Sequence, residues 1–120
     1  MKVLFVEDEP LHFIFWAERL PKNIEIIQAF SIGEAREKFE KNPDFAAIVV
    51  DACVPGSWPN THNLVSDFRE TFSGPMIAIS HLEPFRRKLL QYGCDHEAEK
   101  AEIPEKLLEV IGAIPEPANK

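Results

Sequence analysis

The sequence predicts an α/β domain built as a doubly wound parallel sheet in a three-layer sandwich. Four short apolar segments and a fifth, charged one alternate with five segments of helical periodicity along the chain. The apolar segments are continuous rather than alternating in polarity, which is typical of strands that are buried on both faces. Right-handed crossovers between such strands place helices on both sides of the sheet. A length of 120 residues suits one domain, so we expect residues 1–120 to fold as a single unit.

The first strand is predicted over residues 2–6, which form a compact apolar run. A helix follows over residues 10–20, because Pro10 suits the first turn of a helix and Pro21 stops it. Residues 25–29 form the second predicted strand.

The second helix is predicted over residues 31–41, where Ser31 and Glu34 have the spacing of a capping box. Pro43 disfavours helical geometry in the preceding residue and therefore ends this helix. Residues 46–50 are the clearest buried strand of the chain, since all five are apolar.

After a long loop, the third helix is predicted over residues 63–72, with its apolar side chains on one stripe. Residues 76–80 form the fourth strand, and residues 84–92 form the fourth helix, with Gly93 at its C-terminal cap. The fifth strand is expected over residues 95–100, although this segment is highly charged.

The last helix is predicted over residues 104–114, and residues 115–120 are expected to be a frayed tail. Leu107, Leu108 and Ile111 recur at helical spacing and are expected to face the core.

Composition excludes several classes of protein. The formal net charge is −7, which argues against a nucleic-acid groove or binding to an anionic membrane. No apolar stretch approaches the ~18 residues that a membrane span needs, and the N-terminus turns acidic too soon for a secretory signal. Cys53 and Cys94 do not make a disulfide framework, so we expect a reducing, cytoplasmic environment.

Polar side chains gather where the predicted strands end. Ligands of doubly wound sheets bind beyond the carboxyl ends of the strands, so the residues there are the candidates for a site. They are Glu7, Asp8 and Glu9 after the first strand, Asp51 to Pro55 after the third, Ser80 and His81 after the fourth, and Lys100 after the fifth.

This set predicts chemistry on phosphate. Three crowded carboxylates, Glu7, Asp8 and Asp51, repel one another unless they take up protons or a cation, and an all-oxygen cluster suits Mg²⁺ better than Zn²⁺. The hydroxyl of Ser80 and the ammonium of Lys100 are donors that can hold phosphoryl oxygens. A carboxylate can attack phosphorus and form an aspartyl phosphate.

The chain resembles the receiver domain of two-component response regulators over nearly its whole length. The motifs that carry the resemblance are VLFVEDEP, IVVDACVPG, MIAIS and YGCDHEAEK, in this order and at matching separations. The resemblance implies a flavodoxin-like (βα)₅ fold with strand order 2-1-3-4-5. The sequence contains no output domain after residue 114, so we expect either a stand-alone receiver or one domain of a longer regulator.

The resemblance also implies roles for individual residues. Asp51 would be the phosphoacceptor, and Ser80 and Lys100 would contact the phosphoryl oxygens. Glu7, Asp8 and Asp51 would bind Mg²⁺ together with the backbone carbonyl of Cys53. The phosphoryl group would come from a sensor histidine kinase or a histidine phosphotransfer protein, and the change in conformation would act on an output protein. Such a domain is not an enzyme in the usual sense, since it only modifies itself.

Four positions depart from the receiver pattern. Ala101 stands where proline usually follows the lysine, Glu97 stands where an aromatic residue is usual, and bulky His81 replaces a small residue. The loop after Asp51 also looks longer than usual. The first two departures concern the usual output switch, and we expect Glu97 to stay in solvent because burying its charge is costly. The basic run 86–88 is then available for an acidic partner.

An alternative function is a degenerate receiver-like module that binds proteins without a phospho-switch. A phosphatase of the haloacid-dehalogenase type is disfavoured, because the sequence after the first strand is Glu7-Asp8-Glu9 rather than Asp-x-Asp. Two readings also remain for Phe13 and Ile14, which lie either under the long loop or in an exposed patch for a partner. The four histidines have no metal-ligand spacing, and both cysteines are expected to be inert.

Overall fold

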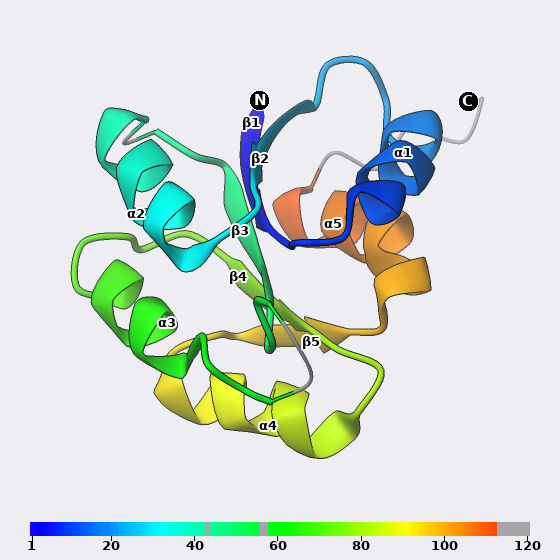
Figure 1. The fold of residues 1–120 in the computed structure, drawn as a ribbon. Coiled ribbons are helices and arrows are strands. Elements are labelled where there is room, and N and C mark those ends of the chain that lie inside the picture. Colours follow the sequence, from blue (N-terminus) through cyan, green and yellow to red (C-terminus); the bar gives the residue numbers. More distant parts are fainter. Residues whose placement is uncertain (43, 56–57, 113–120) are drawn as a thin grey trace.

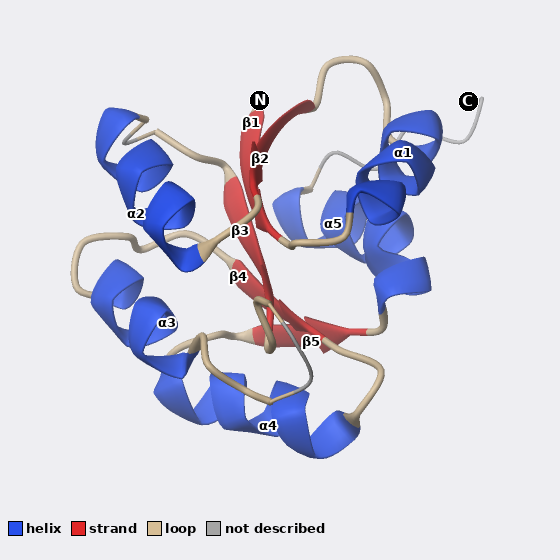
Figure 2. Cartoon of the chain, in the orientation of Figure 1, coloured by secondary structure: helices blue, strands red, loops and turns tan. Residues whose placement is uncertain are grey.

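A computed structural model describes residues 1–42, 44–55 and 58–112. Helices and strands alternate along the chain as the sequence predicts (Figures 1 and 2). The elements are β1 (Lys2–Val6), α1 (Pro10–Arg19), β2 (Glu25–Ala29), α2 (Ile32–Lys41), β3 (Ala47–Asp51), α3 (His62–Arg69), β4 (Met76–Ile79), α4 (Glu83–Tyr92), β5 (His96–Ala98), the 3₁₀ turn η1 (Lys100–Glu102) and α5 (Ile103–Ile111).

The five strands form one parallel sheet in the order β2-β1-β3-β4-β5. This is the flavodoxin-like fold with the predicted strand order. Helices α1 and α5 cover one face of the sheet, and α2, α3 and α4 cover the other (Figure 1). Each face therefore has its own apolar core, which explains why the strand residues are apolar on both sides.

The register of the strands decides which residues meet at the carboxyl edge. Val6 is paired with Val50, the residue before Asp51, and Asp51 itself is paired with Ile79. Ile79 is in turn paired with Ala98 on β5. Asp51 therefore lies at the carboxyl edge of the sheet, together with the residues that directly follow β1, β4 and β5.

Helix starts follow the sequence signals, with small differences. Ser31 caps α2 as predicted, since its Oγ accepts a hydrogen bond from the amide of Glu34 at 3.1 Å. The Glu34 carboxylate in turn accepts a hydrogen bond from the amide of Phe30. In a standard capping box the donor would be the amide of the next residue, Ser31. Gly93 ends α4 at φ +139°, a conformation that favours glycine.

Some predicted boundaries were wrong. β3 is shifted by one residue from the predicted 46–50, so Asp51 is its last residue, and α3 covers His62–Arg69 rather than 63–72. β5 has three residues rather than six, because the backbone turns at Glu99, whose amide donates to the Glu102 carboxylate. The predicted end of the second helix at residue 41 is confirmed. The predicted end of the last helix at residue 114 and the tail 115–120 lie outside the described residues.

Candidate functional site at the carboxyl edge of the sheet

Three carboxylates meet at the carboxyl edge. Glu7, Asp8 and Asp51 each offer an oxygen, and these oxygens lie within 4.8 Å of one another. Glu7 is fully buried and Asp51 is 4% exposed, whereas Asp8 is half-buried. Asp51 is the last residue of β3, and Glu7 directly follows the end of β1, the strand that pairs with β3. The predicted acidic cluster is therefore present.

Lys100 bridges two of these carboxylates. Its Nζ lies 2.9 Å from Oε1 of Glu7 and 2.9 Å from Oδ2 of Asp51. Burial lowers the pKa of Lys100, but the hydrogen bonds and charges of Glu7 and Asp51 outweigh it, so the pKa is raised overall. The lysine therefore stays charged and partly balances the cluster.

The crowding of carboxylates changes the pKa of Glu7. Burial and the charge of Asp51 raise the pKa of Glu7 from 4.5 to about 7, against the opposing effects of Lys100 and of the Glu9 amide. Near neutral pH a large share of Glu7 is therefore protonated. The single positive charge of Lys100 does not offset three carboxylates. A hard cation would balance the remaining negative charge, because all three side chains offer oxygens as ligands.

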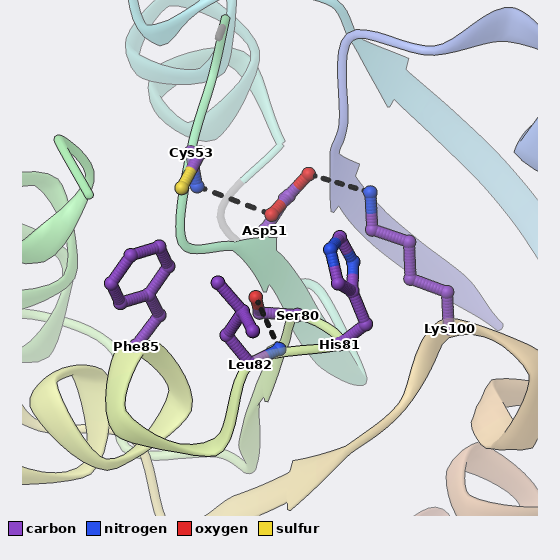
Figure 3. A pocket seen from close by; sticks show the side chains of 7 residues that line it. All are labelled: Asp51, Cys53, Ser80, His81, Leu82, Phe85 and Lys100. Carbon is purple, nitrogen blue, oxygen red and sulfur yellow. Dashed lines mark hydrogen bonds and ion pairs between the residues drawn. The ribbon is translucent and has the colours of Figure 1, made fainter. Parts of the chain in front are cut away.

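A pocket of about 140 Å³ opens beside Asp51 (Figure 3). In Figure 3, Cys53, Leu82 and Phe85 lie on one side of Asp51, and His81 and Lys100 lie on the other. The pocket therefore has an apolar wall facing a wall of nitrogen-bearing side chains.

The acceptor carboxylate is held from two directions. Oδ1 of Asp51 accepts a hydrogen bond from the Cys53 amide at 3.1 Å, and Oδ2 faces Lys100. The Asp51 carbonyl accepts from the Thr61 hydroxyl at 2.8 Å, which ties the loop after β3 to its strand. Ser80 is 4% exposed, and its Oγ accepts a hydrogen bond from the Leu82 amide at 3.1 Å. Both side chains are therefore oriented by neighbouring backbone.

His12 also lies at this edge, although the sequence predicts no role for it. Its Nδ1 lies 3.4 Å from Oε1 of Glu7, and its ring stacks on Trp16 with the ring centroids 5.7 Å apart. Burial and the charge of Lys100 lower the pKa of His12. The signal in the sequence was its position, in the first turn of the helix that follows the acidic pair.

Glu97 is less exposed to solvent than predicted. Its side chain is only 28% exposed, and its carboxylate oxygens lie 3.0 Å from Arg86 Nε and 3.2 Å from Arg87 Nε. Arg86 also donates to the carbonyl of Ser80 at 2.6 Å. Two arginines of α4 thus lower the cost of holding a carboxylate on β5, and they are not free for an acidic partner. In place of an aromatic residue, two ion pairs connect β5 with α4, and the Arg86 hydrogen bond connects α4 with the end of β4.

The two readings for Phe13 and Ile14 are also resolved. Phe13 is buried, but against Phe5, Trp16 and Phe30 rather than under the loop after β3. Ile14 is 57% exposed, on the outer side of α1. The two residues therefore have different environments.

The cysteines are free thiols, and burial raises the pKa of Cys94 to about 12, which agrees with an inert residue. Within residues 1–42, 44–55 and 58–112, the candidate metal ligands cluster at Glu7, Asp8 and Asp51 and include no histidine. None of the helices in the described ranges combines the length and apolarity that crossing a bilayer requires.

No family model and no curated protein sequence matches the chain. Solved structures do match. A two-component response regulator from Clostridium difficile is similar with a TM-score of 0.74 and 19% identity, over 100% of this chain and 99% of that one. The BeF₃-activated N-terminal receiver domain of Klebsiella pneumoniae RstA gives 0.75 and 21%, over 94% and 97%. A CheY-like receiver domain protein from Methanospirillum hungatei gives 0.74 and 22%, over 93% and 90%.

These comparisons confirm the predicted resemblance at the level of the fold. The chain has the architecture of response-regulator receiver domains, and its acidic cluster lies at the end of β3, at the carboxyl edge of the sheet.

Proposed function

We propose that the chain is a response-regulator receiver that accepts a phosphoryl group on Asp51 with Mg²⁺ and signals by a change in conformation. The observation that carries this proposal is the meeting of Asp51 with Lys100, 2.9 Å away, inside a cluster of three carboxylates. The donor is a phosphohistidine of a sensor histidine kinase or a histidine phosphotransfer protein. The domain modifies itself rather than turning over a substrate, and it works in the cytoplasm.

The chemistry follows from the groups around Asp51. A carboxylate oxygen of Asp51 attacks phosphorus, the phosphorus–nitrogen bond of the donor breaks, and the released histidine nitrogen takes up a proton. Lys100 shifts from the carboxylate to the phosphoryl oxygens, and the Ser80 hydroxyl turns from the Leu82 amide to donate to them. The Cys53 amide holds Oδ1 of Asp51 in place.

Mg²⁺ supplies positive charge that lets the acidic cluster admit a phosphoryl dianion. Glu7, Asp8 and Asp51 would hold the ion, with the carbonyl of Cys53 as a further ligand. The raised pKa of Glu7 supports this assignment, because Lys100 only partly offsets the effects of burial and of the Asp51 charge on this carboxyl.

The alternative is a degenerate module that binds proteins through the same fold without a phospho-switch. The observation that favours it is the Glu97 pairing with Arg86 and Arg87, which replaces the usual aromatic residue on β5. The two functions differ in whether the site binds a cation and a phosphoryl group, so a test of Mg²⁺ binding distinguishes them.

We expect millimolar Mg²⁺ to raise the melting temperature, because the ion binds the folded acidic cluster and not the unfolded chain. Asp8→Asn should weaken this shift, since it removes one of the three carboxylates. Asp44→Asn, which changes an exposed acid on the loop before β3, is the matched control and should leave the shift intact. The measurement is thermal unfolding with and without Mg²⁺. A melting temperature that does not respond to the ion would favour the degenerate module.

We expect the phosphorylated protein to lose its phosphoryl group slowly. Hydrolysis needs a water in line with the phosphorus–oxygen bond, and the apolar side chains of Leu82 and Phe85 on the pocket wall cannot orient one. Cys53 is a poor orienting group as well, because burial raises the pKa of its thiol and keeps it neutral. A phosphoryl half-life of seconds at room temperature would contradict this expectation.

The same pocket predicts slow loading from small phosphodonors, because bulky His81 lies beside Asp51 and narrows access (Figure 3). His81→Ala should speed loading by acetyl phosphate by roughly threefold to tenfold, the effect of a modest change in access. His96→Ala is the matched control, since His96 lies on β5 outside the pocket lining. Loading that is unchanged by His81→Ala would rule out bulk as the cause.

A further inference from the structure

We propose that Trp16 is a positioning residue for Lys100: its indole N–H holds the backbone of the lysine so that the ammonium reaches Glu7 and Asp51. The inference rests on the proposed function, because it assigns a second residue to the phosphoryl-binding lysine. Trp16 Nε1 donates to the Lys100 carbonyl at 2.9 Å, across 84 residues of sequence.

Lys100 needs such support because it lies beyond the sheet. β5 ends at Ala98, so the strand ladder with β4 stops before the lysine. Lys100 instead begins the turn η1, and Ala101 follows it without the fixed φ of a proline. The local hydrogen bonds of this turn run between neighbours in the sequence, such as the amide of Glu102 to the carbonyl of Glu99 at 2.9 Å. They shape the turn but do not fix its position against the acidic cluster.

Trp16 is a rigid anchor for this purpose. Its side chain is fully buried in the core between the sheet and helices α1 and α5. The ring contacts Phe5 and Phe13 at centroid distances of 4.9 Å and 5.6 Å. A buried indole N–H needs an acceptor, and the Lys100 carbonyl satisfies it. The hydrogen bond therefore ties the turn that carries the lysine to the aromatic core.

The same ring supports the other side of the cluster. His12 stacks on Trp16, and Nδ1 of His12 lies 3.4 Å from Oε1 of Glu7. Trp16 thus touches one residue that faces Glu7 and holds another that pairs with both Glu7 and Asp51. These contacts connect Trp16 with the acidic cluster in addition to its packing in the core.

The test is a double-mutant cycle between Trp16→Phe and Lys100→Ala, with phosphorylation by acetyl phosphate and Mg²⁺ as the readout. We expect Trp16→Phe to slow phosphorylation by roughly fivefold to tenfold, the effect of one lost hydrogen bond. In the Lys100→Ala background the same change should slow it by less than about twofold, because its effect acts through the lysine. Equal slowing in both backgrounds would overturn the proposal.

Two further variants separate positioning from packing. Replacing Trp16 by benzothienylalanine keeps the ring but removes the N–H donor, so it should reproduce the effect of Trp16→Phe even if the latter folds poorly. Trp58→Phe removes an indole that is 77% exposed, and it should leave the rate unchanged. A benzothienylalanine variant with the wild-type rate would show that the donor has no role.

The side-chain NMR signals of Lys100, identified by their loss in Lys100→Ala, give a readout that does not need phosphorylation. In the wild type they should be shifted away from those of the exposed lysines, and the benzothienylalanine variant should bring them closer. Unchanged Lys100 signals in that variant would overturn the positioning role. A wild-type protein that takes up no phosphoryl group would instead contradict the proposed function, so the two failures are distinguishable.

Discussion

Asp51→Asn should lose phosphorylation by acetyl phosphate by on the order of a thousandfold or more, since an amide is a poor nucleophile and the attacking carboxylate is gone. The fold should survive, because the change removes one of three crowded charges and keeps the shape of the side chain. The Cys53 amide can still donate to the remaining carbonyl oxygen. Phosphate-affinity electrophoresis after incubation with acetyl phosphate and Mg²⁺ measures the loss.

The matched control for this prediction is again Asp44→Asn, which makes the same chemical change at an exposed position. It should be phosphorylated at the wild-type rate. Asp51→Asn protein that is modified as readily as the wild type would show that another side chain is the acceptor.

The second large effect is the dependence of stability on pH through Glu7. The pKa of this carboxyl is about 7 in the folded protein, against an ordinary value of 4.5. Because the folded-state pKa is the higher one, its contribution to stability is fully present below pH about 4.5 and is lost as the pH rises through about 7. The loss amounts to about 3 kcal/mol in the free energy of unfolding.

Glu7→Gln removes this titration, and the comparison of the two proteins isolates it from the other ionisable groups. Without Mg²⁺, we expect the free energy of unfolding of the wild type to fall relative to that of Glu7→Gln between pH 4.5 and 8. Saturating Mg²⁺ should reduce the difference, since the ion favours the ionised carboxylate. Chemical denaturation at several pH values gives these free energies. A difference that does not change with pH would mean that Glu7 ionises normally in the folded protein.

The sequence was sufficient for the fold and for the main members of the site. Continuous apolar strands alternating with helices predict a parallel sheet, and parallel strands end at one edge. The sequence alone therefore predicts that Glu7, Asp51 and Lys100 lie close together, as the structure shows. The position of each carboxylate depends on where its strand ends, and the change from apolar to acidic residues after residues 6 and 50 marks these ends in the sequence.

The misjudged residues depend on contacts between distant segments. Glu97 looked too costly to bury, but α4 brings Arg86 and Arg87 next to it, and no local pattern gives the orientation of α4 against β5. The hydrogen bond from Trp16 to Lys100 likewise depends on where η1 lies, which no local pattern gives. β5 is shorter than predicted because the charged segment favours a turn capped by Glu99 and Glu102 over a longer strand.

The central claim is that Asp51 accepts a phosphoryl group, and reductive trapping tests it most directly. The protein is incubated with acetyl phosphate and Mg²⁺, treated with borohydride and analysed by peptide mass spectrometry, since borohydride reduces an aspartyl phosphate to homoserine. We predict homoserine at position 51 in the sample with Mg²⁺ and none in the sample with chelator. Homoserine at another position, or at position 51 to the same extent without Mg²⁺, would contradict the account.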